Sequence, residues 1–412
     1  MLDIPSGVAS LKTYFSDDKV EEIAFGANPA LAIIPKFTTW TGQYFNEALL
    51  YEDVMGSATF SNAQANGGQF QAAQFQLSEV EDYVVAQIAN RIILASGDDR
   101  GAFLRAASTT VASALRHAGR SLGQALFLNG QGTIGQVSVI TGNVITLTDV
   151  TQSVNFSVGM TLDAIAYNGT SIRAGTMLVT AIDRANGLIT CAGGLIAGLT
   201  ANTGTTGDFL IRDGDFGKKI TGFRGWLPFP GDNGSTAPGR LSATDSFFNV
   251  NRNNDVTRLA GWYQDCRGLP LPEAIEQTAE YLVREEGEPD YLFFNPATVA
   301  LLKNQLGGKV VYESVEAFKN PQISFPSVRF EGPAGPIKIV ADRQCPVNQG
   351  FMMTMKTWTL RLRGKAPRII SYDMEGLEAL RIWNQDGIEL RVGYYGQLGC
   401  SGPGMNAIMQ LL

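Results

Sequence analysis

The residue types that most often carry catalysis or bind metals are scarce and scattered in this chain. It has one histidine, His117, and four cysteines, Cys191, Cys266, Cys345 and Cys400, with no CxxC pair and no cysteine beside the histidine. Structural zinc sites need clustered Cys and His ligands, and a Ser-His-Asp triad needs a histidine held by a carboxylate, which His117 lacks in its sequence neighbourhood. We therefore expect no metal site, no catalytic residue and no disulfide framework. The thiols should be reduced and buried, and His117 should be solvated or in an interface.

Residues 130–135, GQGTIG, match the GxGxxG pattern of dinucleotide sites. Such a site needs the motif after a strand and at the start of a helix, where backbone N–H groups meet the pyrophosphate. Here helical spacing precedes the motif and strand-like runs follow it, so we interpret it as a helix stop with a linker and expect no cofactor. The acidic pairs Asp17-Asp18 and Glu285-Glu286 are typical of solvated faces, because adjacent residues point apart on a helix.

Three arginines, Arg105, Arg116 and Arg120, form the one electrostatic feature that stands out. They lie in a segment of helical spacing. Eleven residues are almost a whole number of turns, so Arg105 and Arg116 share a face and Arg120 lies near it. The sequence leaves two interpretations open: a positive surface that faces phosphates, or cations that pair with acids of a neighbouring segment or subunit.

The composition limits the class of protein. Of 412 residues, 17 % are charged, against about 25 % in ordinary soluble chains. The net charge of −7 argues against a protein that wraps around nucleic acid, because such binding uses Lys and Arg to replace counterions. Few charges and 44 % hydrophobic residues suggest a surface covered by other copies of the chain. We find no signal-peptide pattern and no run of 18 apolar residues, so we expect neither export nor a membrane span.

The elements that would position these residues change in type along the chain. Residues 1–41 show little periodicity, which predicts an extended arm whose apolar stretch 30–34 packs elsewhere. Residues 42–80 alternate polar and apolar around Asn-Gly-Gly at 66–68, which predicts a long hairpin. Helical spacing from Ser96, with Asp98 and Asp99 in the first turn, to 129–130 predicts a helix of about 30 residues.

A compositional island follows that helix. Residues 131–217 contain no proline, lysine, glutamate or tryptophan, but 14 glycines and 14 threonines, which predicts a separate β-rich module over 131–218, a small sandwich or barrel. The remainder predicts a helix at 270–286, a buried strand at 291–294, a helix from Asn295-Pro296 to Gly307-Gly308, and mostly strands from 328 onward. The fold class is α+β with an all-β insertion.

In this order, five segments resemble the major capsid proteins of tailed double-stranded DNA bacteriophages. They are ALFLNGQG (125–132), PDYLFFNPATVALL (289–302), GPIKIVADRQCP (335–346), TWTLRLRG (357–364) and NQDGIELRVGYYGQLGC (384–400). The resemblance implies the Hong Kong 97-type shell fold, in which an arm and an extended loop reach across neighbouring subunits. Each segment alone is of modest specificity, and their order makes the case.

The resemblance also implies a division of the chain into parts. Carried over to this sequence, the parts are an N-terminal arm (1–41), an extended-loop hairpin (42–80), a peripheral-domain spine helix (81–130), an inserted β-rich domain (131–218), an axial domain (219–350), peripheral-domain strands (351–395) and a C-terminal return to the axial domain (396–412). The simplest family members lack the insertion. Here it would project from the shell as a stabiliser or as a site for another molecule.

The function implied is structural rather than enzymatic. Copies would form hexamers and pentamers of an icosahedral shell around the genome, assembled in the host cytoplasm, with no membrane partner. The implied partners are a scaffolding protein, a portal, a decoration protein and packaged DNA bound non-specifically, with Arg105, Arg116 and Arg120 as an inner-surface basic stripe. Some relatives cross-link the loop through lysine, but this chain has no lysine between Lys36 and Lys218, so we expect no such bond. The alternatives are another β-rich interaction protein that binds through 131–218, and a glycine-rich oxidoreductase, which would depend on the GxGxxG segment.

Overall fold

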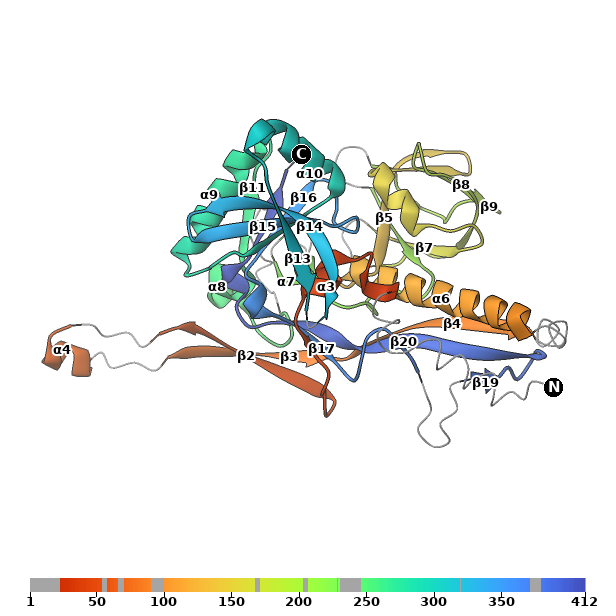
Figure 1. Ribbon diagram of the computed structural model, residues 1–412, viewed down its shortest axis with the longest axis horizontal. Coiled ribbons are helices and arrows are strands. Elements are labelled where there is room, and N and C mark those ends of the chain that lie inside the picture. The colour runs from red at the N-terminus through yellow and green to blue at the C-terminus, as the bar shows by residue number, and fades with distance from the viewer. Residues whose placement is uncertain are drawn as a thin grey trace.

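The computed structural model arranges the chain as two large sheets, a closed barrel and a long hairpin (Figure 1). It describes residues 23–53, 58–65, 70–89, 100–166, 171–202, 207–227, 229, 246–318, 320–370 and 379–411. None of the described helices combines the length and apolar character that crossing a membrane requires.

The seven-stranded sheet runs in the order β11-β21-β16-β12-β15-β14-β13. Its strands are β11 (Trp262–Asp265), β12 (Tyr291–Phe294), β13 (Val311–Ala317), β14 (Asn320–Gly332), β15 (Gly335–Ala341), β16 (Gln349–Met353) and β21 (Ala407–Gln410). Helices α9 (Leu271–Arg284) and α10 (Pro296–Leu306) pack on it through apolar side chains at helical spacing. Both helices confirm the sequence prediction to within two residues, because proline in the first turn and glycine after the last turn mark their ends.

The six-stranded sheet is centred on β20 (Gly387–Cys400), which pairs with most of the other strands. These are β1 (Lys36–Phe37), β4 (Val80–Ala89), β17 (Trp358–Leu362), β18 (Arg368–Ile369) and β19 (Ala379–Arg381). Helix α6 (Arg100–Ala125) lies along β4 and β20, and its Val111, Leu115 and Ala118 are buried against them. In Figure 1 this layer forms the long base of the molecule.

The barrel is a closed ring of six strands in the order β10-β5-β6-β9-β8-β7. The strands are β5 (Thr133–Thr141), β6 (Val144–Leu147), β7 (Thr161–Ile165), β8 (Met177–Asp183), β9 (Leu188–Ala192) and β10 (Phe209–Arg212), and a 3₁₀ turn, η1 (Val150–Asn155), covers one end. The chain enters and leaves the barrel at neighbouring points. Gly132, just before β5, lies so close to Asp215, just after β10, that a Cβ atom added to Gly132 would be 2.9 Å from the carbonyl oxygen of Asp215.

The predicted hairpin is present and projects far from the rest of the molecule (Figure 1). Strand β2 (Tyr44–Glu52) pairs antiparallel with β3 (Gln71–Ser78), and helix α4 (Phe60–Ala65) lies at the far end. The predicted turn at 66–68 lies outside the described residues.

Two ion pairs fix the root of the hairpin to β17. Arg361 binds Glu47 with 2.8 Å between Nη2 and Oε2, and Arg363 binds Glu79 at the same distance. The first pair is the more buried, with side-chain exposures of 16 % for Arg361 and 9 % for Glu47, and the Arg361 guanidinium also lies over the ring of Phe45. One mostly buried and one half-exposed ion pair therefore help to hold the root of the hairpin in place.

A cluster of aromatic rings joins these parts. Phe223 begins the short helix α7 (Phe223–Trp226), and its ring centroid lies 4.9 Å from that of Trp358 in β17, 5.5 Å from that of Phe127 just after α6, and 5.8 Å from that of Phe351 in β16. Trp226 in turn contacts Phe75 of the hairpin at 5.0 Å. One buried cluster thus touches both sheets, the long helix and the hairpin.

Part of the predicted arm is helical rather than extended. Helix α3 (Pro29–Ile33) forms there, with every residue buried. Its apolar stretch does pack elsewhere in the chain, as expected, but the helix also gains a partner for its first turn, since Ala30 N donates to the carboxylate of Asp342 at 3.0 Å. Sequence periodicity does not report such a long-range contact.

The long helix ends earlier than predicted. Helix α6 stops at Ala125, and Leu126 O accepts a hydrogen bond from Phe223 N at 2.7 Å. The backbone at Gly222 approaches so closely that an added Cβ would lie 2.3 Å from the carbonyl oxygen of Ala125. The arrival of α7 therefore terminates the helix. Its predicted start at Ser96, Asp98 and Asp99 lies outside the described residues.

The two ion pairs at the hairpin root should differ in their contribution to stability. Glu47→Ala leaves the mostly buried Arg361 without its carboxylate, and we expect it to lower the free energy of unfolding by about 3 kcal/mol. Glu79→Ala removes the partner of the half-exposed Arg363 and should cost less than about 1 kcal/mol. Urea unfolding of both variants measures the difference, and equal losses would contradict this assignment.

The buried carboxyl group of Asp342 should make stability depend on pH, because burial outweighs the hydrogen bond from Ala30 N, which lowers the pKa. Burial raises the pKa of Asp342 to about 6, whereas an unfolded aspartate titrates near ~3.9. Asp342 therefore stays protonated up to a higher pH in the folded chain than in the unfolded chain. The stability that this difference in pKa contributes is complete below about pH 4 and is lost as the pH rises through about 6. We expect the difference in unfolding free energy between the original chain and Asp342→Asn to change by about 3 kcal/mol across this window. A constant difference between the two chains would refute it.

Candidate functional site

The structure describes the side chains of two of the three arginines in the predicted stripe. Arg116 and Arg120 lie on α6, one exposed and one half-buried, while the side chain of Arg105 lies outside the described residues. The structure adds three arginines from elsewhere in the chain, which the sequence analysis missed. No sequence signal could have found them, because they come from separate segments that only the fold brings together.

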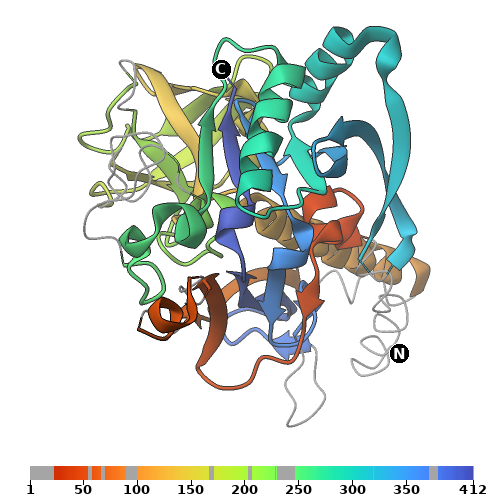
Figure 2. The same cartoon turned by 90° about the vertical axis from the view of Figure 1, so that its left-hand side faces the viewer.

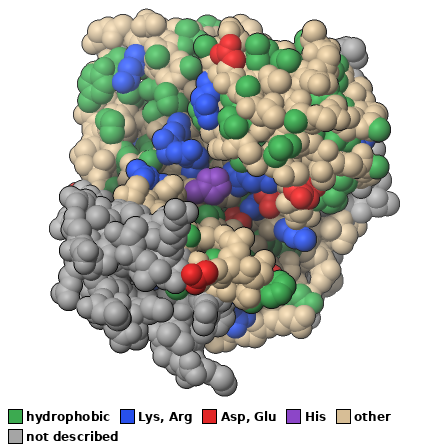
Figure 3. Space-filling model, turned by 90° about the vertical axis from the view of Figure 1, so that its right-hand side faces the viewer, with side chains coloured by type: hydrophobic (Ala, Val, Ile, Leu, Met, Phe, Trp, Pro, Cys, Tyr) green, Lys and Arg blue, Asp and Glu red, His purple; other side chains and the backbone are tan. Residues whose placement is uncertain are grey.

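The resulting arginine cluster consists of Arg116, Arg120, Arg184, Arg212 and Arg343. Arg184 lies between β8 and β9 of the barrel, Arg212 ends β10, and Arg343 follows β15 of the seven-stranded sheet. The cluster is centred on Arg120, whose pKa is lowered first by burial and then by the nearby charges of Arg343, Arg116, Arg212 and Arg184. Figure 3 shows a hollow in this face of the molecule, with blue side chains gathered around the single purple histidine.

The charge of the cluster is not neutralised within the described part of the chain. Arg116 and Arg184 donate to the backbone carbonyls of Ala112 and Phe156, and Arg212 donates to Ser121 Oγ at 3.2 Å. Among the described residues Arg120 and Arg343 have neither a hydrogen-bond partner nor an ion pair. The cluster therefore offers guanidinium groups to an acidic partner.

Two carboxylates close to the cluster are already engaged. Asp82 and Asp215 bind the buried ammonium group of Lys219 at 2.8 and 3.2 Å. His117 lies in the same hollow, and its pKa is lowered first by burial and then by Arg212 and Arg120, which favours the uncharged imidazole. No group of His, Cys, Asp and Glu side chains within the described residues could hold a metal ion.

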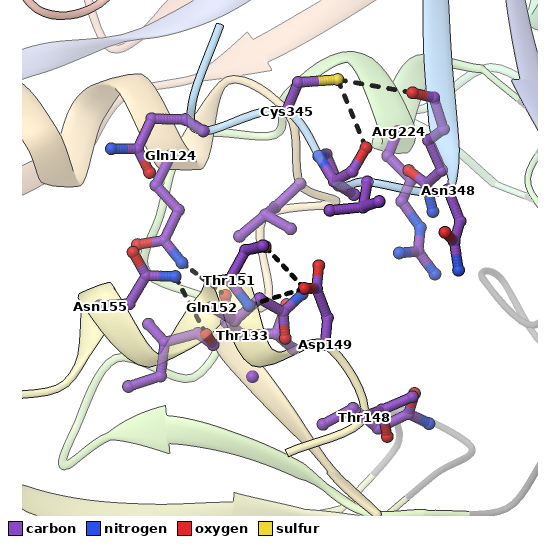
Figure 4. Close-up of a pocket in the computed structure, with 18 of the residues that line it drawn as sticks. Gln124, Thr133, Thr148, Asp149, Thr151, Gln152, Asn155, Arg224, Cys345 and Asn348 are labelled. Carbon is purple, nitrogen blue, oxygen red and sulfur yellow. Dashed lines mark hydrogen bonds between the residues drawn. The ribbon is translucent and has the colours of Figure 1, made fainter. Parts of the chain in front are cut away.

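A cleft of about 400 Å³ adjoins the cluster between the barrel and the seven-stranded sheet. Arg343 lies at its border together with Arg224 and Arg267. Figure 4 shows its polar lining, in which Asn155 lies beside Gln124 and Asp149 accepts hydrogen bonds from Thr151.

Four buried amide atoms in the cleft lining make no hydrogen bond to the rest of the described chain. They are Gln152 Oε1, Asn155 Oδ1, Gln344 Nε2 and Gln349 Oε1. Each of these atoms is almost inaccessible to solvent, so it lies beneath the surface of the cleft and does not face its open space. The sequence analysis missed this cleft, because its lining comes from segments more than 200 residues apart.

Of the other sequence motifs, the cysteines and the GxGxxG segment take the places predicted for them. Asp17 and Asp18 lie outside the described residues, and Glu285 and Glu286 follow α9 instead of lying on it. All four cysteines are free and buried, and burial raises the pKa of each thiol, to about 11 at Cys266. The GxGxxG segment follows α6 and leads into β5, with Gly130 and Gly132 at φ of 90° and 79°. It is a helix stop and linker, as the sequence indicates.

Comparison with solved structures identifies the fold. A chain of the "Cyanophage A-1(L) capsid asymmetric unit" matches with a TM-score of 0.55 at 10 % sequence identity, covering 93 % of this chain and 92 % of that chain. A chain from the capsid of a native GTA particle matches with a TM-score of 0.46 at 8 % identity (94 % and 90 % covered), and one from Mycobacterium phage Ogopogo with 0.43 at 10 % identity (94 % and 92 % covered). No family model and no curated protein sequence matches the chain. The cyanophage match confirms the predicted capsid-type α+β fold.

Proposed function

We propose that this chain is the major capsid protein of a tailed double-stranded DNA bacteriophage. The observation that carries the proposal is the match of fold to the cyanophage A-1(L) capsid chain over nearly the whole length of both chains. The role is structural: copies associate into hexamers and pentamers, and these close an icosahedral shell around the genome in the virion. A head-to-tail contact that closes into rings explains how one chain builds both hexamers and pentamers.

Exposed apolar side chains on the projecting parts support the proposal that the subunit contacts neighbouring subunits through these parts. Phe60 on α4, at the far end of the hairpin, is 83 % exposed, and Trp383, between β19 and β20, is 94 % exposed. Large apolar groups at the extremities of the molecule are available for contacts with other proteins. The hairpin and the β19–β20 turn would reach neighbouring subunits in the shell.

The remaining partners follow from the proposed role. Assembly in the host cytoplasm would use a scaffolding protein and a portal, a decoration protein would bind outside, and packaged DNA would be contacted without sequence specificity. The shell would hold together without lysine-based cross-links from the hairpin, because no lysine lies between Lys36 and Lys218.

The purified chain should form large particles held by non-covalent contacts alone. Light scattering across concentration should show discrete rings or particles in the megadalton range, and a denaturing gel of those particles should show only bands of the 44.3 kDa subunit. A chain that stays monomeric with and without a co-expressed scaffold would contradict the proposed function. Ladders on the gel would contradict only the absence of cross-links.

We assign the barrel to stabilising the assembled shell or to binding another molecule. Its two ends adjoin, and the cleft beside it is lined by polar side chains that another molecule could contact. The alternative function, an interaction protein that binds through 131–218, would use this same region.

Removing the barrel should separate folding from shell stability. Replacing residues 133–214 by a short glycine-serine linker should leave a folded subunit, because both sheets and the aromatic cluster are built from other segments. Circular dichroism and thermal unfolding of the subunit should stay close to those of the full chain, while its shells should dissociate at lower denaturant concentration. Shells of unchanged stability would count against the assigned role.

A further inference from the structure

One face of helix α9 is an acidic stripe. Its apolar side packs on the seven-stranded sheet, and the opposite side exposes Glu273, Glu276 and Glu280, which recur at helical spacing and form what we call the acidic face. Glu280 accepts a hydrogen bond from Arg284 and Glu273 from Gln277, whereas Glu276 has no partner in the described part of the chain. The stripe thus retains negative charge in the isolated subunit.

The acidic face and the arginine cluster lie on opposite flanks of the molecule. Helix α9 is at the left of Figure 1 and runs across the front of Figure 2, which looks at that flank. The arginine cluster opens on the other flank, which Figure 3 shows. A ring of identical subunits brings the left flank of each copy against the right flank of the next.

We propose that the acidic face of α9 in one subunit binds the arginine cluster of its neighbour in the ring. This inference rests on the proposed shell function and names the contact that closes each ring. Carboxylates with spare acceptors on one flank meet guanidinium groups without acidic partners on the other, and charge-assisted pairs of this kind are among the stronger polar contacts. Opposite potentials on the two flanks also steer copies into one orientation.

The shape of the cluster favours a protein partner over duplex DNA. Its guanidinium groups come from α6, the barrel and the end of β15 and surround a hollow, and the central Arg120 is half-buried. A duplex presents phosphates along a rigid convex surface, whereas side chains on a helix can extend into a hollow. The net charge of −7 further weakens general attraction to a polyanion.

Charge reversal on each flank tests the contact directly. Glu273→Lys with Glu276→Lys reverses the acidic face, and Arg116→Glu with Arg343→Glu reverses exposed members of the cluster. Each double variant should raise the concentration needed for half-assembly at least about tenfold in low salt, measured by light scattering. Glu316→Lys with Glu331→Lys, two exposed acids on β13 and β14, makes the same change of charge elsewhere and should assemble like the original chain.

Recombining the reversals separates a lost contact from a misfolded chain. All four substitutions in one chain should restore assembly, because each flank again meets its opposite. An equimolar mixture of the two double variants should form rings only by alternation, and alternation closes with six members but not with five. The mixture should therefore give hexamers without pentamers.

Each other outcome is decisive. If the original chain assembles and the α9 reversal assembles equally well, or if the four-substitution chain is not restored, the contact is wrong while the shell function stands. If the cluster reversal leaves assembly intact but abolishes binding to a short DNA duplex, the cluster faces nucleic acid instead. If the original chain never assembles, the proposed function fails and this contact fails with it.

Discussion

The ring contacts around Phe223 hold the subunit together. Phe127, Phe351 and Trp358 come from three different elements, and each touches the same ring. Because α7 is only four residues long, it contributes little helical stability of its own and depends on this packing. The arrival of α7 also ends the long helix at Ala125, so the same contact sets the length of α6 and the point from which the barrel departs.

Arginines in this chain occur in two situations that a sequence cannot distinguish. At the hairpin root, Arg361 and Arg363 have carboxylates within hydrogen-bond distance and fix one element to another. On the opposite flank, Arg120 and Arg343 have no such partner among the described residues. Only 17 % of the residues are charged. An arginine without a carboxylate partner is therefore a larger share of the surface charge here than in an ordinary soluble protein.

The sequence predicts the elements whose signals are local. Helix α9 could be predicted because its apolar spacing, its prolines and Gly287 all lie in one stretch of the sequence. Helix α3 could not be predicted in this way, because its five buried residues show no periodicity and its first turn depends on Asp342, more than 300 residues away. The strands β13 and most of β14 also precede the point where strand-like runs were expected. Of the site, only Arg116 and Arg120 follow from helical spacing, because Arg184, Arg212 and Arg343 meet them through tertiary packing alone.

The close approach of Gly132 and Asp215 has a consequence for how such chains can diverge. The register of both sheets depends on the gap between these two residues and not on the number or order of the residues between them. Insertions, losses or wholesale replacement there leave the register of both sheets unchanged. The position can therefore accept one inserted module in place of another without a change in either sheet, although such an exchange would remove Arg184 and Arg212 from the arginine cluster.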